Sequence, residues 1–193
     1  MHEQSKATRR RYYDGAFHSR YFVGNGIDIG AGPDSLAKYQ QFFLGIKHIK
    51  QWDMPDGDAQ YMKTVKDETF DFLHSSHCLE HMVDVRVALK NWVRIIKPGG
   101  YLIITVPDED LYEAGNWPSK FNSDHKHTFT IYKSESWSPV SQNITTLIEE
   151  LAEDGHKVER LQLQNEFWYP QLHGNDQTTL PNTESAIELI IQK

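Results

Sequence analysis

The chain has 193 residues, of which 38% are hydrophobic and 24% charged, and its formal net charge is −7. This length suits one well-cored domain rather than two, so we expect residues 1–193 to form a single domain. The acidic balance argues against nucleic acid as a partner, because binding it usually requires a basic face. The basic run Arg9-Arg10-Arg11 points three ways on a helix and predicts a solvated surface.

Nothing in the sequence indicates a membrane or secreted protein. No apolar run approaches the roughly 18 residues needed to cross a bilayer, and the polar N-terminus lacks the apolar segment of a secretory signal. Cys78 is the only cysteine, which excludes an internal disulfide and suits a reducing compartment. We therefore expect a cytoplasmic protein with no membrane partner.

Residues 1–22 are expected to form an N-terminal helical segment, with the helix over residues 6–22. Tyr13, Phe17 and Tyr21 recur at every fourth position, so one aromatic stripe faces another part of the molecule. Two interpretations remain open for this stripe. It either packs on the core or covers a ligand pocket as a lid.

The next expected element is a strand over residues 26–30 that ends in a glycine turn. Asp28 stands just before Gly30 and Gly32, and glycine there permits unusual φ values and a close approach of backbone N–H groups. The helix expected over residues 34–43 would then direct its positive N-terminus at an anionic group. The pattern favours a turn that lies against a ligand.

Strands and helices alternate along the following residues, as in a parallel sheet with helices on both faces. Proline and glycine within residues 97–100 end the helical pattern of residues 84–96. The looser pattern over residues 107–140 predicts a long connection across one end of the sheet. In order, we expect strands at 46–53 and 70–75, a helix at 84–96, a strand at 101–106, a helix at 141–154, and strands at 158–167 and 186–192.

Five motifs in sequence resemble the core of the class I S-adenosylmethionine (SAM)-dependent methyltransferases. The resemblance implies a Rossmann-like three-layer α/β/α sandwich with a mostly parallel, seven-strand-type sheet and an antiparallel last strand. It implies a cofactor-binding core at residues 23–106, an acceptor-side connection at 107–140, and a C-terminal helix and strand pair at 141–193. The motifs are Gly26-Ile-Asp-Ile-Gly-Ala-Gly-Pro33, Trp52-Asp53, Gly57-Asp58-Ala59, Phe70-Asp-Phe-Leu-His-Ser-Ser-His-Cys-Leu-Glu-His81 and Lys97-Pro-Gly-Gly-Tyr-Leu-Ile-Ile-Thr-Val-Pro107.

Transferred by position, the resemblance assigns the amino-acid end of SAM to the glycine turn. The backbone of Gly30 and Gly32 would meet the methionine carboxylate, and Asp28 would hold the ammonium group directly or through water. Ser76 and His77, after the strand at 70–75, would line the sulfonium end.

The resemblance assigns the adenosine end of SAM to three further residues. Asp53 would accept hydrogen bonds from both ribose hydroxyls, Asp58 would accept one from the adenine amine, and the Ala59 backbone would lie beside the ring. Family members commonly place a full helix and a third strand between such acids, whereas only residues 54–57 separate them here. Either the helix is lost here, or Asp53 is misassigned and Asp56 is the acid that binds the ribose.

Methyl transfer to a hydroxyl also needs a base, and histidine has a suitable pKa. We expect His125 as the base, with His77 as the second candidate. Within residues 124–127 an acid next to a histidine can orient it, although sequence neighbours need not touch. A polar surface loop without catalytic function is the alternative for this segment.

Acceptor binding is expected at the carboxyl ends of the strands, where open α/β sheets place ligands. Asp108 and Glu109 follow the strand at 101–106 and would bind acceptor hydroxyls or a divalent ion, with Asp124 and His127 beside them. No decisive ligand set is present, so no metal site is predicted.

His77-Cys-Leu-Glu80-His81 matches an inverted zinc-protease pattern. Such a protease needs a third ligand and a long active-site helix, whereas this segment directly follows a buried strand. The methyltransferase interpretation is therefore preferred.

The expected function is methyl transfer from SAM to a small polar acceptor. A hydroxyl of a sugar or polysaccharide precursor is preferred, because the chain looks like bacterial methyltransferases of surface-polysaccharide and related small-molecule biosynthesis. N-methylation of a small amine or amide and a SAM-binding module without turnover are the alternatives. A nicotinamide-dependent dehydrogenase is disfavoured, because Pro33 and Ser35 depart from the Gly-x-Gly-x-x-Gly fingerprint.

Overall fold

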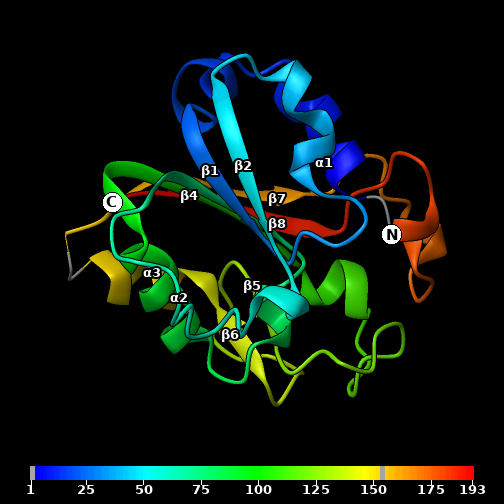
Figure 1. Cartoon of the computed structure of the whole chain (residues 1–193). Coiled ribbons are helices and arrows are strands. Elements are labelled where there is room, and N and C mark those ends of the chain that lie inside the picture. Colours follow the sequence, from blue (N-terminus) through cyan, green and yellow to red (C-terminus); the bar gives the residue numbers. More distant parts are fainter. Residues whose placement is uncertain (1–2, 153–154) are drawn as a thin grey trace.

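The computed structural model describes residues 3–152 and 155–193. Its centre is a six-stranded sheet in the order β2-β1-β3-β4-β8-β7 (Figure 1). The four strands β2, β1, β3 and β4 run parallel, and β8 runs antiparallel to both β4 and β7. The bounds are β1 Gly24–Ile29, β2 Ile46–Trp52, β3 Phe70–Ser76, β4 Ile96–Pro107, β7 Lys157–Gln164 and β8 Ala186–Gln192.

The predicted α/β fold with an antiparallel last strand is confirmed. Among the described residues the sheet has six strands rather than the seven of the expected type. In the described chain only the 3₁₀ turn Met54–Asp56 and an irregular segment connect β2 to β3. The sheet therefore ends at β2, which is an edge strand.

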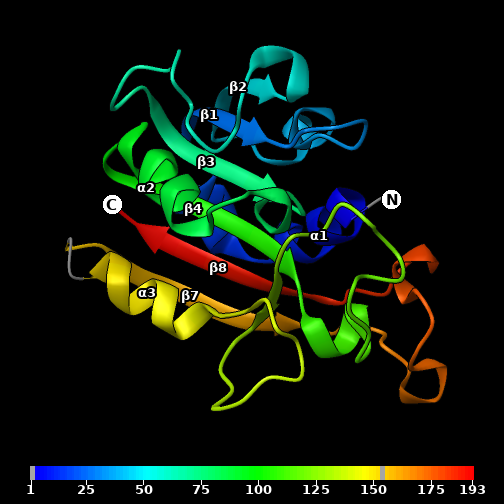
Figure 2. The same ribbon diagram turned by 90° about the horizontal axis from the view of Figure 1, so that it is seen from below.

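Two hydrophobic clusters cover the two faces of the sheet, because successive strand residues point to opposite faces. Phe72, Ile103 and Ile190 belong to one cluster, and their neighbours in sequence, such as Leu73 and Ile104, belong to the other. The helices α2 (Val85–Arg94) and α3 (Ile144–Ala152) cover the second cluster, while α1 (Glu3–Tyr12) lies on the opposite face (Figure 2). This arrangement gives three layers.

The helix predicted over residues 84–96 is close to the observed α2. Asp84 caps its N-terminus by accepting hydrogen bonds from the backbone N–H groups of Arg86 and Val87. The helix ends earlier than predicted, since β4 already begins at Ile96 and includes the Pro-Gly-Gly segment. Gly100 is needed there because a Cβ would lie 2.5 Å from the carbonyl oxygen of Asp71 on β3.

The N-terminal segment differs from the single helix predicted. After α1 the chain turns and forms a separate π-helical turn, Phe17–Tyr21. Tyr13 is 85% exposed, whereas Phe17 and Tyr21 are buried against the sheet. The aromatic stripe is therefore split, and its second part packs in the core.

The prediction of a solvated arginine run is wrong for two of its three residues. Arg11 is fully buried, and its guanidinium donates to Glu188 on β8 with an Nε–Oε2 distance of 2.8 Å. Arg10 forms ion pairs with Glu184 and Glu188. Only Arg9 lies at the surface, so the run attaches α1 to the last strand.

The remaining elements show smaller differences. The helix predicted at 34–43 is a 3₁₀ turn, Leu36–Phe42, and residues 107–140 include a π-helical turn, Glu109–Glu113. A short parallel pair, β5 (Thr128–Thr130) and β6 (Ser141–Asn143), precedes α3. The last two positions of the helix predicted at 141–154 lie outside the described residues.

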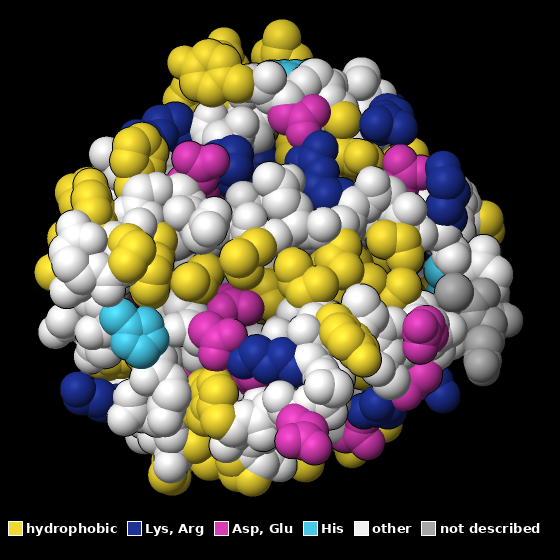
Figure 3. All heavy atoms as spheres, turned by 180° about the vertical axis from the view of Figure 1, so that it is seen from behind, with side chains coloured by type: hydrophobic (Ala, Val, Ile, Leu, Met, Phe, Trp, Pro, Cys, Tyr) yellow, Lys and Arg dark blue, Asp and Glu magenta, His cyan; other side chains and the backbone are white. Residues whose placement is uncertain are grey.

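In the described part of the chain, no helix combines the length and apolarity needed to cross a membrane. Acidic and basic side chains are interspersed on the face shown in Figure 3, with hydrophobic side chains in a band between them. That face has no continuous basic surface.

Candidate active site

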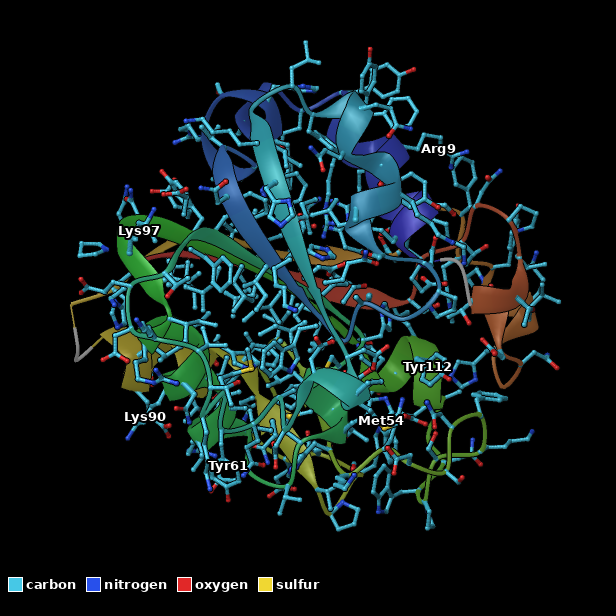
Figure 4. The ribbon with its side chains drawn as sticks, viewed as in Figure 1. Arg9, Met54, Tyr61, Lys90, Lys97 and Tyr112 are labelled. Atoms are coloured by element: carbon cyan, nitrogen blue, oxygen red, sulfur yellow. The ribbon has the colours of Figure 1, made fainter. Side chains whose placement is uncertain are left out.

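The glycine turn follows β1 at the carboxyl end of the sheet. Met54, after β2, and Tyr112, after β4, lie at this same end, whereas Lys97, near the start of β4, lies at the other (Figure 4). Gly30 and Gly32 both have positive φ, +73° and +48°, which L-residues with a Cβ rarely adopt. The amide of Gly30 donates to the carbonyl of Trp52 at 3.0 Å, which attaches the turn to the end of β2.

Asp28 lies directly beneath this turn and is 2% exposed. Its carboxylate accepts hydrogen bonds from the Ser35 hydroxyl and the Leu36 amide, both at 2.8 Å, and contacts His74 Nδ1 at 2.6 Å. Asp28 therefore anchors the start of the 3₁₀ turn to β3. Three of its four lone-pair sites are engaged, so at most one faces a ligand.

His74 and Arg11 extend this buried network across the sheet. Arg11 Nη1 is 3.0 Å from His74 Nε2, and because arginine can only donate, His74 Nε2 accepts and Nδ1 carries the proton donated to Asp28. Burial lowers the pKa of His74 and keeps the ring neutral. The sequence analysis missed both residues. The available signal in the sequence was Glu188, an acid in the middle of the apolar strand β8, because a buried acid there indicates a buried cation opposite.

A cleft opens beside the glycine turn and is bordered by α1. The backbone N–H of Gln4 donates to the Asp34 carboxylate at 3.0 Å, so the loop after the turn caps the start of α1. The start of the N-terminal segment thus forms one wall. The lining residues are Glu3, Gln4, Asp28, the 30–34 turn, His74, Ser76 and His77.

Ser76 and His77 lie on the wall formed by the end of β3. His77 has a φ of +54°, and its Nδ1 is 2.9 Å from the Ser76 hydroxyl. Its Nε2 is buried with no hydrogen-bond partner among the described residues. Burial, reinforced by the neighbouring His125, lowers the pKa of His77 to about 3, so the ring is neutral at physiological pH.

Asp53, Asp56, Asp58 and Ala59 are outside the lining of this cleft, toward the edge strand β2. Asp53 Oδ2 accepts from the Gly32 amide at 3.1 Å, so this carboxylate is next to the glycine turn. Asp56 instead accepts from Lys50 and from the Asp53 amide. Asp58 is exposed and accepts only from the Gln60 amide, 2.8 Å away, and the Ala59 carbonyl accepts from the indole of Trp92.

On the acceptor side, Asp108 and Glu109 have different environments. Asp108 caps the π-helical turn by accepting from the amides of Asp110 and Leu111, and burial raises its pKa to about 6. Glu109 is fully buried. Its carboxylate accepts from the Lys133 ammonium and from three hydroxyl groups, of Thr128, Ser136 and Ser141, which leaves it no free lone pair for an acceptor.

His125 is buried beside a glutamate that sequence reasoning did not identify. Its Nδ1 is 2.6 Å from Glu113 Oε1, so Glu113 orients the ring. The neighbouring Asp124 instead contacts His81 Nδ1 at 2.8 Å. His127 turns toward the Val83 carbonyl, 3.3 Å from its Nε2. Glu113, and not the adjacent Asp124, therefore contacts His125 Nδ1.

The His125 loop is held against the turn after β3. The amides of Lys126 and His127 donate to the carbonyl of Glu80, at 2.9 and 3.2 Å. The rings of His81 and His125 meet edge to face, with centroids 5.0 Å apart. Glu80 is fully buried next to both histidines. The His-x-x-Glu-His pattern was the sequence signal for this cluster, although it did not indicate His125 as a neighbour.

Comparison with known proteins identifies the family to which the chain belongs. Residues 9–138 match the family model described as a methyltransferase domain, and the chain belongs to this family. The fold is similar to the crystal structure of a SAM-dependent methyltransferase from Archaeoglobus fulgidus, with a TM-score of 0.62, 17% identity, and coverage of 100% of this chain and 95% of that one. The chain thus has a methyltransferase domain, on a fold that it shares with that SAM-dependent methyltransferase.

Two further similarities are informative. A Haloferax volcanii protein solved in complex with the Trm112 methyltransferase activator has a TM-score of 0.58, with 14% identity over 98% of this chain and 92% of that one. An uncharacterized protein of Methanocaldococcus jannaschii is 28% identical over 115 residues, 52% of this chain and 56% of the relative. The chain thus spans about half the length of that curated relative.

Proposed function

We propose that the protein transfers the methyl group of SAM to a hydroxyl of a small polar acceptor, such as a sugar or a polysaccharide precursor, in the cytoplasm. The observation that carries the proposal is a pair of histidines, His77 directly after β3 and His125 on the loop held against the turn that follows β3. His77 lines the cleft and its buried Nε2 has no hydrogen-bond partner among the described residues, and His125 has its Nδ1 held by Glu113. A neutral imidazole nitrogen is the group that accepts a hydroxyl proton.

The glycine turn and its surroundings would hold the cofactor. The cleft lining brings Asp28, Gly30, Gly32, Ser76 and His77 together, which fits the amino-acid and sulfonium end of SAM. A Cβ on Gly32 would find only one atom within 4 Å, so the turn has open space on that side. When bound, SAM supplies an activated methyl group, and the chain mainly aligns the reactants and excludes water.

The adenosine end would extend toward β2. Asp53 lies beside the Gly32 amide and is the favoured ribose acid, because Asp56 is already paired with Lys50. Asp58 is exposed with a free oxygen, which suits a hydrogen bond from the adenine amine, and the Ala59 backbone would adjoin the ring.

The N-terminal segment is proposed as a lid. Glu3 and Gln4 border the cleft, and Asp34 in the glycine-turn loop caps α1. Because the same loop contacts α1 and would contact the cofactor, closing of this segment and cofactor binding depend on each other.

The acceptor would bind beyond the sulfonium end, near Asp108 and residues 124–127. Asp108 and the exposed carboxylate of Asp124 are proposed to bind acceptor hydroxyls, with His127 at the rim. Glu109 is better assigned to holding the acceptor-side connection together, because all its hydrogen bonds are internal. A small uncharged or cationic acceptor suits an acidic protein better than nucleic acid does.

Calorimetric titration with S-adenosylhomocysteine tests which residues bind the cofactor. We expect micromolar binding by the wild type and a loss of about tenfold to hundredfold for Asp53→Asn, since hydrogen bonds to a charged group contribute roughly 1.5–3 kcal/mol. Asp56→Asn is the matched control and should retain nearly full affinity. Equal losses in both variants would contradict the assignment of the ribose acid.

The test of activity is transfer of a labelled methyl group from SAM to a panel of sugars, sugar nucleotides and small amines, with products identified by mass spectrometry. An O-methylated product supports the proposal. An N-methylated product would replace the acceptor class. Cofactor binding with no transfer to any acceptor would favour a SAM-binding module without turnover.

A further inference from the structure

Three side chains outside the cofactor cleft converge on one point. Glu80 Oε1 is 3.9 Å from His81 Nε2 and 3.9 Å from His125 Nε2. All three atoms lie within 4.8 Å of one another. Glu80 and His81 come from the turn after β3, and His125 comes from the acceptor-side connection, so two segments far apart in sequence build the cluster.

The hydrogen bonds around the cluster fix which histidine nitrogen carries a proton. His81 Nδ1 contacts the Asp124 carboxylate at 2.8 Å, and His125 Nδ1 contacts the Glu113 carboxylate at 2.6 Å. Because carboxylates only accept, both Nδ1 atoms donate. In the neutral rings the lone pairs therefore reside on the two Nε2 atoms that face Glu80.

Among the described residues, no group donates a hydrogen bond to the Glu80 carboxylate. Glu80 is 0% exposed, and neither of its carboxylate oxygens has a hydrogen-bond partner among the described residues. A buried, unpaired carboxylate is costly unless it is paired or coordinates a metal. One carboxylate and two imidazole lone pairs thus face one another, and a cation between them would satisfy all three.

We propose that Glu80, His81 and His125 bind a divalent transition-metal ion. Two imidazoles and one carboxylate are a known ligand set for Zn²⁺ and for the neighbouring first-row metals, whereas Mg²⁺ and Ca²⁺ prefer oxygen ligands alone. Zn–N bonds of about 2.0–2.1 Å place tetrahedral ligands about 3.3 Å apart. The two Glu80–histidine pairs therefore need to close by about 0.6 Å, and the histidine pair by up to about 1.5 Å.

The surroundings resemble the outer shell of a metal site. Each histidine ligand donates its other ring N–H to a carboxylate, the arrangement that fixes ring orientation and raises ligand basicity. The His81 side chain is 24% exposed, so an ion can reach the site from solvent. Three protein ligands leave at least one coordination position for water or an acceptor oxygen.

Metal binding would also decide which histidine accepts the acceptor's proton, a consequence that rests on the proposed function. Nε2 of His125 has one lone pair, so it cannot both hold the ion and take a proton. The remaining candidate for the base is His77, which lines the cleft and whose buried Nε2 has no partner among the described residues. An acceptor hydroxyl on the open position of the ion would lose its proton more readily.

The experiment is a titration of tag-free protein, first stripped with a chelator, using Co²⁺ followed by visible absorption and Zn²⁺ followed by calorimetry. We expect one equivalent of each ion to bind, and Mg²⁺ to fail to compete. Glu80→Gln and His125→Ala should each weaken binding by at least about tenfold, and Glu113→Gln, which removes only the orienting carboxylate, by about 10–100-fold. The control His48→Ala removes an exposed histidine on β2 and should bind as the wild type does.

Binding of S-adenosylhomocysteine is measured on the same samples to keep the two proposals separate. Variants that retain it are folded, so their loss of metal is local. Wild-type protein that binds S-adenosylhomocysteine but neither Co²⁺ nor Zn²⁺ would overturn the metal site and leave the proposed methyl transfer standing. Metal binding that persists in both Glu80→Gln and His125→Ala would also overturn it.

Discussion

Replacing Glu188 by glutamine is expected to lower the free energy of unfolding by about 3–5 kcal/mol, because removing one partner of a buried ion pair leaves the other uncompensated. Glu188 is 0% exposed and pairs with Arg11, which is equally buried, and with Arg10 and Arg160. Chemical denaturation followed by circular dichroism measures this change. The control is Glu150→Gln, which alters an exposed pair with Arg86 and should cost less than about 1 kcal/mol.

The same ion pairs predict how stability depends on pH. Burial alone would raise the pKa of Glu188, but the charges of Arg11 and Arg10 outweigh it and lower that pKa from 4.5 to about 2. A lowered pKa contributes stability that is complete above about pH 4.5 and is lost as the pH falls toward about 2. The wild type should therefore lose stability more steeply than Glu188→Gln over this range. Parallel curves, or equal stability of the two proteins at neutral pH, would contradict the assigned role.

Gly30→Ala is expected to weaken S-adenosylhomocysteine binding by about tenfold or more while the protein remains folded. A Cβ at this position would lie 2.6 Å from Cys78 Cβ and 2.7 Å from its Sγ, and φ is +73°. The left-handed backbone alone costs a residue with a Cβ roughly 1–2 kcal/mol. The contact forces the turn to move as well, so the cleft wall that the turn forms changes shape.

A second glycine separates backbone strain from the close contact. Gly174 has a φ of +88°, and a Cβ added there would meet nothing within 4 Å, so Gly174→Ala carries similar strain at a residue outside the cleft lining. It should lower the midpoint of thermal unfolding slightly and leave the Kd for S-adenosylhomocysteine unchanged. Wild-type affinity in Gly30→Ala would remove the glycine turn from the cofactor site.

The sheet could be predicted from the sequence because its strands are short apolar runs bounded by turn residues. The run from Tyr101 to Val106 became the core of β4, and the 3₁₀ turn found after Trp52 agrees with one interpretation of the short gap there, a lost helix. The N-terminal segment could not be predicted in the same way. The partner of Arg11 is 177 residues away, and no local pattern distinguishes a buried arginine from a solvated one.

Part of the candidate site could also be predicted from the sequence, and part could not. The glycine turn, Asp28 and His77 belong to contiguous motifs, and the structure brings them to one cleft. The surroundings of His125 depend on tertiary contacts instead. Glu113, rather than the adjacent Asp124, contacts the His125 ring, because the π-helical turn after β4 brings this more distant acid close to it. Sequence adjacency was a poor guide where a loop folds back on itself.

The buried path from Asp28 through His74 and Arg11 to Glu188 has a thermodynamic consequence. It joins the glycine turn to α1 and to the final strand. If cofactor binding stabilises the docking of the N-terminal segment, then docking of that segment raises the affinity for the cofactor by the same factor, because linkage is reciprocal. If the proposed cofactor site is correct, the contacts between α1 and β8 would contribute to the affinity for SAM.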